Sequence, residues 1–515
     1  MRVIIIDDGV DPSILEGKEL FVDLIVTNEL TVEQNVDQHS GIHGKNCVQI
    51  IQRYVEDMCI GSIKILDEST RTGQVDQLIV ALKWCYEHQI DCIHMSIGTT
   101  LRNDFNPLLS MIRKLWYQGC VMVSACSNDK IYTVPACTSM VLGVSTNMTV
   151  NTDHIMEHNK YYSSFDFTAA SQHDITLFGR KILSGYSNSY ATPVVTASVI
   201  NQWDKISHLK YGALKRALIQ DEPLDRYFLY AYRCDFVDSA IVIGKREEIT
   251  PELCDFEIKG IYTFDQLEQI QLEGRVSIIF THSSIMEINK EREEQGILKQ
   301  IRQFFSKYGQ WILGVVSLGD CNSELEKVFK ENDCVLWTPK VSNLWYQESV
   351  FLNHPFDKPL FIIDGKGDIA VRISQKIEQL FTEERYLVSC ITENYLYSLY
   401  GCDYVKKEYI DSKILSYYAR YYNLDLLLYV GHKIETVQED ILVKIENNRF
   451  ICYVDGEVIM KSEDLTNDTV ECMFHKVLKC FGPVIVFVTF LYIFLQVLLL
   501  LLENMYLVFL FLFLL

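Results

Sequence analysis

The chain has 515 residues, a formal net charge of −21 at pH 7 and 49% hydrophobic residues. This length suffices for about two to four domains with buried cores, and the acidic balance without a basic stripe argues against a nucleic-acid partner. The sixteen cysteines are scattered without the spacing of a disulfide framework or a zinc site, which predicts a reducing, cytoplasmic compartment.

The first 200 residues alternate short apolar strands with helix-like segments. We predict strands at "RVIIID", "IGSIKIL", "DCIHMSIG", "GCVMVSAC" and "SMVLGVST", and an amphipathic helix at "QVDQLIVALKWCYEHQ". Their alternation predicts an α/β fold, with a parallel sheet, right-handed crossovers and helices on both faces. Functional residues of such sheets collect at the carboxyl ends of strands, where Asp7, residues 96–98 and residues 126–129 fall.

The stretch "SGYSNSYATPVV", residues 184–195, begins a helix. Serine and asparagine favour helix N-caps, and proline is tolerated in the first turn, so capping alone accounts for the composition. A serine at a helix N-terminus also lies in a positive field that favours an oxyanion. The stretch taken alone favours capping.

The remainder predicts two smaller α/β regions and an apolar tail. The second region includes the strand "RVSIIF", a turn at residues 281–284 and one charged helix from about Met286 to Tyr308, and the third ends in a hairpin with Asn-Asn and Asp-Gly turns. The predicted domain organisation is a first domain at 1–204, a helical connector at 205–235, an α/β domain at 236–345, an α/β domain at 346–475 and a hydrophobic tail at 480–515.

Residues 481–502 carry no charge and are long enough to cross a bilayer. The lysines before them predict that the N-terminal bulk stays in the cytoplasm, attached to the membrane through this segment. A buried core helix and an altered reading frame at the end of the gene are the alternatives that the sequence leaves open.

Three polar motifs of the first domain combine an acid, a base and a nucleophile. Asp7 ends a buried strand, His43 opens a helix-like run, and Ser189 lies in the stretch of residues 184–195. The order Asp, His, Ser is one of the known chain orders of the serine triad, in which a carboxylate orients the imidazole that deprotonates the serine. Asn128 follows another strand, where its side-chain amide can bind an oxyanion.

These motifs resemble those of the subtilisin-like serine proteases over about residues 1–200. "VIIIDDGVD" resembles the family's aspartate motif, "HGKNCVQII" its histidine motif, "VSACSND" its oxyanion motif and "SGYSNSYATPVV" its serine motif. "IHMSIG" is similar to the strand that lines the substrate cleft, so the resemblance implies that Ser96, Ile97 and Gly98 pair with an extended peptide. It also implies that Asp7, His43 and Ser189 are catalytic and that Asn128 binds the oxyanion.

The chain departs from the family next to the nucleophile. Ser187 and Asn188 stand where the family has Gly-Thr, which raises the question of whether Ser189 is free to attack. Since all four polar catalytic positions are present, we predict an active intracellular endopeptidase that acts on a peptide or protein, with maturation of a ribosomally made peptide as a hypothesis. We assign no cofactor and no metal ligands from the sequence. The alternative is a catalytically inactive, subtilase-like peptide-binding accessory protein.

The third region has a weaker resemblance. "PLFIIDGKGDIAVRISQKIEQLF" has the strand, Gly-Lys-Gly loop and helix of a P-loop but lacks its Gly-Lys-Ser/Thr ending. Residues 355–475 vaguely resemble degenerate dethiobiotin-synthetase-like P-loop domains. A structural P-loop-like domain is the preferred interpretation, with a nucleotide-dependent enzyme as the alternative.

Overall fold

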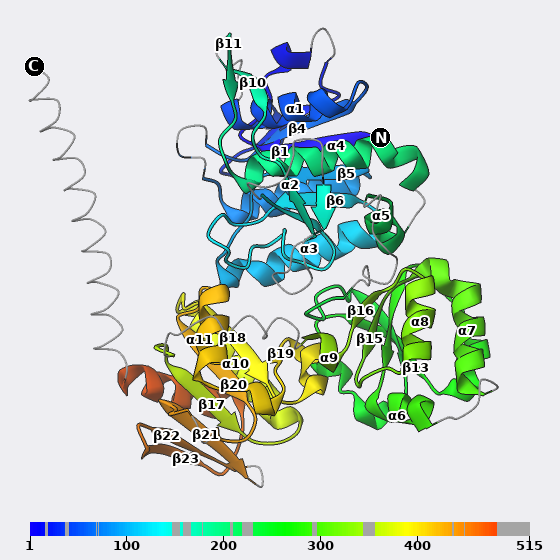
Figure 1. Ribbon diagram of the computed structural model, residues 1–515. Helices are drawn as coiled ribbons and strands as arrows, with labels where there is room; N and C mark the ends of the chain where they lie inside the picture. The colour runs from blue at the N-terminus through cyan, green and yellow to red at the C-terminus, as the bar shows by residue number, and fades with distance from the viewer. Residues whose placement is uncertain are drawn as a thin grey trace, which may run out of the picture. The chain divides into compact units, whose positions relative to one another are not determined.

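The computed structural model divides the chain into two compact units, Met1–Lys358 with Arg385–Leu427 and Pro359–Glu384 with Leu428–Leu515 (Figure 1). The sequence predicts five segments instead of two units, and the boundaries of those five segments remain a prediction. The structure describes the whole chain except residues 16–18, 37–40, 68–69, 71, 147–154, 158–165, 178, 207–209, 219–229, 291–295, 343–355, 435–436, 447–448 and 481–515.

The first unit begins with a nine-stranded sheet in the order β3-β2-β4-β1-β5-β6-β7-β9-β8. Neighbours from β2 to β9 pair in parallel, whereas β3 and β8 are antiparallel at the two edges. This arrangement confirms the predicted parallel α/β sheet. The strands are β1 (Arg2–Asp7), β2 (Asp23–Val26), β3 (Val32–Gln34), β4 (Cys59–Lys64), β5 (Cys92–Met95), β6 (Val121–Ala125), β7 (Leu142–Thr146), β8 (Ile155–Glu157) and β9 (Phe167–Ala169).

Helices flank this sheet in two packed pairs, α1 with α4 and α2 with α3. The strands that come after β1 in the chain lie on both sides of it in the sheet, so the direction of winding reverses at β1. Ligands of open α/β sheets bind at the carboxyl end of the strands at such a point. A separate hairpin joins β10 (Asp174–Leu177) to β11 (Arg180–Leu183). The helices are α1 (Ile42–Tyr54), α2 (Val75–Glu87), α3 (Phe105–Gln118), α4 (Asn188–Ile206) and α5 (Tyr211–Leu218).

A second sheet of the first unit has five parallel strands in the order β13-β12-β14-β15-β16. Its elements are β12 (Ser239–Ile243), β13 (Glu257–Tyr262), β14 (Val276–Phe280), α6 (His282–Lys290), α7 (Ile297–Tyr308), β15 (Ile312–Ser317), α8 (Ser323–Glu331), β16 (Val335–Trp337) and α9 (Pro339–Ser342).

Two predictions for this region are wrong. Residues 282–284 begin α6 instead of forming a turn, because the carboxylate of Glu248 accepts hydrogen bonds from the backbone N–H and hydroxyl of Ser283 at the helix start. The single charged helix from Met286 to Tyr308 is instead α6 followed by α7, because Gly296 has a non-helical backbone and precedes α7.

The first unit also holds β18 (Val388–Thr392), the short strand β19 (Asp403–Tyr404) and α11 (Ser412–Tyr421). The second unit holds β17 (Leu360–Asp364), α10 (Asp368–Glu383), β21 (Ile441–Glu446), β22 (Arg449–Val454) and β23 (Glu457–Ser462), and β20 (Leu426–Val430) contains the boundary.

The predicted hairpin of the second unit is confirmed. β22 pairs with β21 and with β23 in antiparallel fashion, and the Asp455-Gly456 turn has positive φ at both residues, as tight hairpin turns require. The predicted Asn-Asn turn, residues 447–448, lies outside the described residues.

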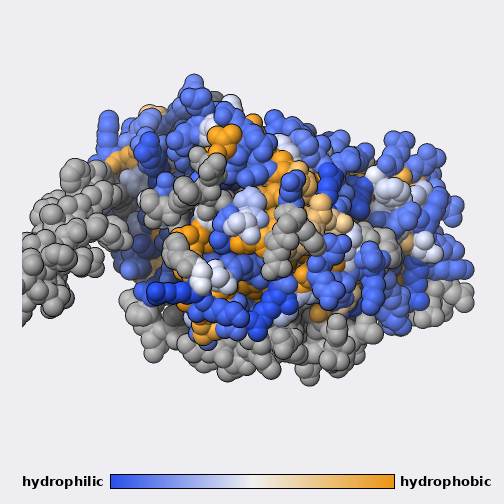
Figure 2. Space-filling view, turned by 90° about the horizontal axis from the view of Figure 1, so that it is seen from above, coloured by the Kyte–Doolittle hydropathy of each residue, from blue (hydrophilic) through white to orange (hydrophobic). Residues whose placement is uncertain are grey.

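Figure 2 shows a largely hydrophilic face with hydrophobic residues gathered near its middle, as expected for a chain with this net charge. Within the described residues, no helix has the length and apolarity needed to cross a membrane. The predicted membrane segment 481–502 lies outside those residues.

Candidate active site

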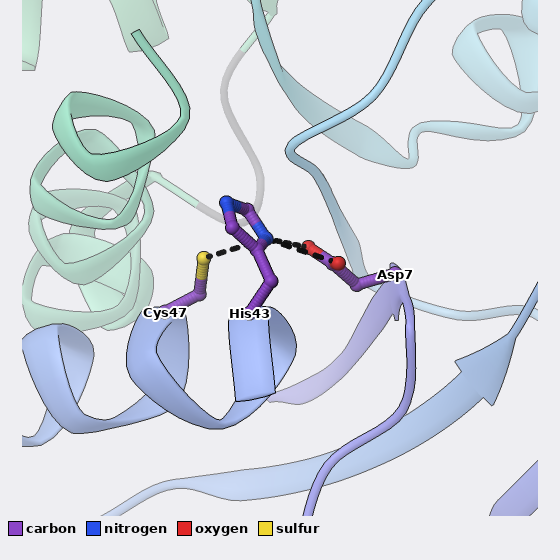
Figure 3. A group of neighbouring side chains, drawn as sticks. All are labelled: Asp7, His43 and Cys47. Atoms are coloured by element: carbon purple, nitrogen blue, oxygen red, sulfur yellow. Dashed lines mark hydrogen bonds and ion pairs between the residues drawn. The ribbon is translucent and has the colours of Figure 1, made fainter. Parts of the chain in front are cut away.

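Strand β1 brings a carboxylate to the carboxyl edge of the nine-stranded sheet. Its burial pattern is continuous after Arg2, and Asp7, its last residue, is 0% exposed. Both Asp7 oxygens lie near Nδ1 of His43, with Oδ1 at 3.0 Å and Oδ2 at 2.9 Å, as Figure 3 shows. The structure therefore places the predicted acid and base in direct contact.

The next carboxylate, Asp8, positions the helix that carries the imidazole. Its Oδ2 accepts a hydrogen bond from the backbone N–H of His43 at 3.0 Å, and its Oδ1 accepts one from Gly44 at 2.8 Å, so Asp8 caps the start of α1. A Cβ at Gly41 would lie 1.9 Å from Cγ of Asp8, which explains the glycine before the helix. Asp7 thus holds the ring of His43, and Asp8 holds the backbone of the same residue.

The electrostatics of this group favour an ionised Asp7. Burial alone would raise the pKa of Asp7, but the His43 imidazole lowers it below its usual range. Burial alone would lower the pKa of His43, whereas Cys47 and Asp7 raise it, with a net rise above the usual 6.5. Because burial also raises the pKa of Cys47, its thiol is neutral near pH 7, and Asp7 is the anion that faces the imidazole.

Ser189 lies in the first turn of α4 and is half-buried. Its Oγ donates a hydrogen bond to the carbonyl of Ser96 at 3.4 Å, and within the described part of the chain it makes none to His43. A catalytic hydrogen bond of this kind is often loose in a free enzyme and tightens with substrate.

A cleft of about 790 Å³ brings the predicted site residues together. Its lining includes all seven of them, namely Asp7, His43, Ser96, Ile97, Gly98, Asn128 and Ser189. The strand itself is shorter than predicted, because β5 ends at Met95 and residues 96–98 continue past it. Gly98 is exposed, and a Cβ there would lie 2.6 Å from Cγ2 of Thr133, so the neighbouring wall requires glycine.

Asn128 is exposed in the segment that follows β6. Its Oδ1 accepts a hydrogen bond from the backbone N–H of Asn188 at 3.0 Å. This bond fixes the amide plane and leaves Nδ2 as the donor available to the cleft. The arrangement suits the predicted oxyanion role.

Asn188 is a site residue whose contribution sequence reasoning missed, although its departure from the family pattern was visible. Its Oδ1 accepts from the backbone N–H of Thr146 at 2.8 Å, and its Nδ2 donates to the carbonyls of Cys126 and Ser127 at 3.0 and 3.1 Å. The buried side chain thus joins the end of β7 and the residues that follow β6 to the start of α4. The departure next to Ser189 is therefore a fixed part of the fold.

Tyr190 and Cys47 are further residues around His43 that the sequence analysis did not single out. The Tyr190 ring stacks on the imidazole with centroids 5.1 Å apart and planes at 28°. Cys47 lies one helical turn after His43, with Sγ 3.9 Å from Nδ1 and 3.4 Å from Oγ of Ser96. The i, i+4 spacing of His43 and Cys47 was the available signal.

Asp7, His43 and Cys47 are also the group of described residues that could hold a metal ion (Figure 3). Their ligand atoms lie within 4.8 Å of one another, and all three residues are buried. A thiolate, an imidazole and a carboxylate together suit zinc. Such an ion would use the same Nδ1 that now faces Asp7.

The chain has limited similarity to known proteins. No family model matches the chain. It is 29% identical over 134 residues to the minor extracellular protease Epr of Bacillus subtilis (strain 168), a match that covers 25% of this chain and 19% of that protein's length.

Similar solved structures include a lanthipeptide protease, with 16% identity, a TM-score of 0.33, and 42% of this chain and 78% of that chain covered. A cold-adapted subtilisin-like serine proteinase gives 18% identity and a TM-score of 0.32, over 42% of this chain and 79% of that chain. The epidermin leader peptide processing serine protease of Staphylococcus aureus gives 14% identity and a TM-score of 0.33, over 44% of this chain and 72% of that chain.

The P-loop resemblance of the third region gains no support from these comparisons. The structure does place a loop with Lys366 between β17 and α10, and Gly367 has φ +76°. A strand, a glycine loop and a helix are common to many α/β proteins. Nucleotide binding there stays a prediction.

Proposed function

We propose that this chain is a serine endopeptidase of the subtilisin type. The observation that carries the proposal is the buried Asp7 carboxylate on Nδ1 of His43, in the same cleft as Ser189. A carboxylate on Nδ1 leaves Nε2 as the nitrogen that exchanges a proton with the reacting groups.

The reaction follows from these roles. Neutral His43 accepts the proton of Ser189 through Nε2 while Oγ attacks the carbonyl carbon of the scissile peptide bond. Asp7 stabilises the imidazolium, and Nδ2 of Asn128 donates to the oxyanion. His43 then protonates the leaving amine as the C–N bond breaks, and the same base activates a water that hydrolyses the acyl-enzyme and regenerates Ser189.

Peptides are the substrate class that best suits the site. Residues 96–98 leave the end of β5 along the cleft, where an extended peptide can add hydrogen bonds. Proteins described as a lanthipeptide protease and a leader-peptide processing protease are among the similar structures, which accords with maturation of a ribosomally made peptide. The scattered spacing of the sixteen cysteines is the reason that we place the chain in a reducing, intracellular compartment.

Labelling with a fluorophosphonate probe tests the activity. The full chain should be labelled, Ser189→Ala should not, and His43→Ala should be labelled far more slowly. Ser187→Ala is the matched control, because Ser187 also lines the cleft and lies two residues from the nucleophile. A folded wild-type chain that takes no label would contradict catalysis and favour the peptide-binding alternative.

A further inference from the structure

Hydrogen bonds at its two ends fix the segment that carries Asn128. We call residues 126–134 the oxyanion loop. The backbone N–H of Ser127 donates to Oγ1 of Thr133 at 3.0 Å, so the two ends of this loop are tied next to Asn128. Val134 then exchanges two backbone hydrogen bonds, at 2.9 and 3.0 Å, with Thr99, the residue after Gly98. The loop is a closed unit with Asn128 at its exposed end.

Residues much later in the chain contact this unit at Tyr132. The backbone N–H of Tyr132 donates to the carbonyl of Tyr421, the last residue of α11, at 2.8 Å. Tyr132 is 3% exposed, and its ring packs against two others, with centroids 5.7 Å from Tyr421 and 4.8 Å from Tyr422. The oxyanion loop therefore has its buried anchor in the 385–427 segment.

A largely buried charge pair, with side chains 14% and 12% exposed, fixes the anchor itself. Arg233 forms an ion pair with Asp403 at 2.9 Å, and its guanidinium lies over the rings of Tyr132 and Tyr422, 5.9 and 5.4 Å from their centroids. The hydroxyl of Tyr418 on α11 also donates to Asp403. Separating these partners would leave a buried charge unpaired, which is costly, so the anchor resists displacement.

We propose that the 385–427 segment is a positioning element for the oxyanion donor, acting through Tyr132 and Thr133 on Asn128. The inference rests on the proposed function, because the donor matters only in catalysis. An oxyanion donor works when it is held in advance at the place where charge develops. The anchor supplies that constraint through two hydrogen bonds. One joins Tyr132 to Tyr421, and the other joins Ser127 to Thr133, the residue after Tyr132.

Truncation of the Tyr132 ring tests the coupling. Tyr132→Ala should lower kcat with little change in KM, by a factor below the roughly 10²–10³ that loss of a whole oxyanion donor costs. In an Asn128→Ala background the same change should cause no further loss, because the donor is already absent. Equal, multiplicative losses in both backgrounds would overturn the proposal.

Matched variants separate positioning from general destabilisation. Tyr132→Phe keeps the ring and should retain kcat, and Tyr132→Leu is a milder truncation should the alanine variant fold poorly. Leu24→Ala removes a buried side chain from β2, which lies several strands away from the oxyanion loop, and should lower stability with unchanged kcat. A kcat that simply follows stability across these variants would contradict positioning.

Hydrogen exchange gives a readout that needs no activity. Amides of residues 126–134 should exchange faster in Tyr132→Ala than in the wild type, while those of β1 stay protected. Unchanged exchange in the loop would overturn the anchor even if the enzyme is active. Faster exchange in a chain that no probe labels would instead keep the anchor and contradict the proposed catalysis.

Discussion

Both carboxylate oxygens of Asp7 lie within hydrogen-bonding distance of Nδ1 of His43, at 3.0 and 2.9 Å, in a position that solvent does not reach. The imidazole is therefore fixed in one tautomer by a group with no competing water. Asp7→Asn replaces the anion with a neutral amide that can stabilise the wrong tautomer. We expect kcat to fall by about 10⁴ in a peptide-hydrolysis assay, the scale known for this change in serine triads.

Asp11→Asn is the control for this prediction. Asp11 is an acid of the same segment, but it forms an ion pair with Lys45 at 2.7 Å and does not touch His43. This exchange should leave kcat nearly unchanged. Equal losses in the two variants would show that the charge of the segment matters and the Asp7–His43 contact does not.

The raised pKa of His43 predicts a pH dependence with opposite signs for activity and stability. His43 acts as a base only when neutral, so kcat/KM should rise with pH through a midpoint above the usual 6.5. The charged imidazole is stabilised in the fold, so its contribution to stability is complete below pH 6.5 and is lost as pH rises through the raised pKa.

Two variants identify the source of that shift. In Asp7→Asn the midpoint of the pH profile should fall, since the anion facing the ring is gone. In Cys47→Ala it should fall less, because the neutral thiol contributes only its hydrogen-bond contact with the imidazole. A midpoint that falls only in Cys47→Ala would assign the shift to a thiolate.

The regular elements of the first domain could be predicted because burial and periodicity are local properties of the sequence. Strand β1 has the predicted bounds, and α2 and β5 lie within their predicted segments. The helix from Met286 to Tyr308 failed because apolar and charged residues continue in register on both sides of Gly296, and a single glycine is tolerated in many helices.

The residues of the candidate site likewise differ in whether a local pattern of the sequence identifies them. Asp7, His43 and Ser189 could be found because each lies beside a strand end or a helix start. Asn188 and Tyr132 could not, because their partners come from loops and helices far away in the chain. Such side-chain and backbone pairings depend on the tertiary arrangement, which no local pattern reports.

Loss of the Asn128 amide should affect the transition state more than substrate binding. Asn128→Ala is expected to lower kcat by about 10²–10³ with little change in KM, because the donor acts on charge that develops in the reaction. Asp129→Ala is the neighbouring control, since Asp129 is also exposed in the cleft. A KM effect without a kcat effect would place Asn128 in substrate binding.

Asn188 should matter for stability as well as for activity. Asn188→Ala leaves the N–H of Thr146 and the carbonyls of Cys126 and Ser127 without their side-chain partner, at a cost of about 1–3 kcal/mol for each group that stays buried and unpaired. Urea unfolding should show a lower midpoint than for Ser187→Ala. Equal midpoints for the two variants would mean that water replaces the lost hydrogen bonds.

The group of Asp7, His43 and Cys47 predicts inhibition by zinc. Zinc would take Nδ1 of His43 and Sγ of Cys47, which lie 3.9 Å apart, and would displace the hydrogen bond to Asp7 on which the base depends. Peptide hydrolysis should fall as zinc is added and recover with a chelator. Cys47→Ala should need more zinc for the same inhibition, whereas Cys85→Ala, which removes a buried thiol from α2, should respond as the wild type does. Equal zinc sensitivity in Cys47→Ala and the wild type would place the inhibitory ion elsewhere, on ligands that exclude this thiol.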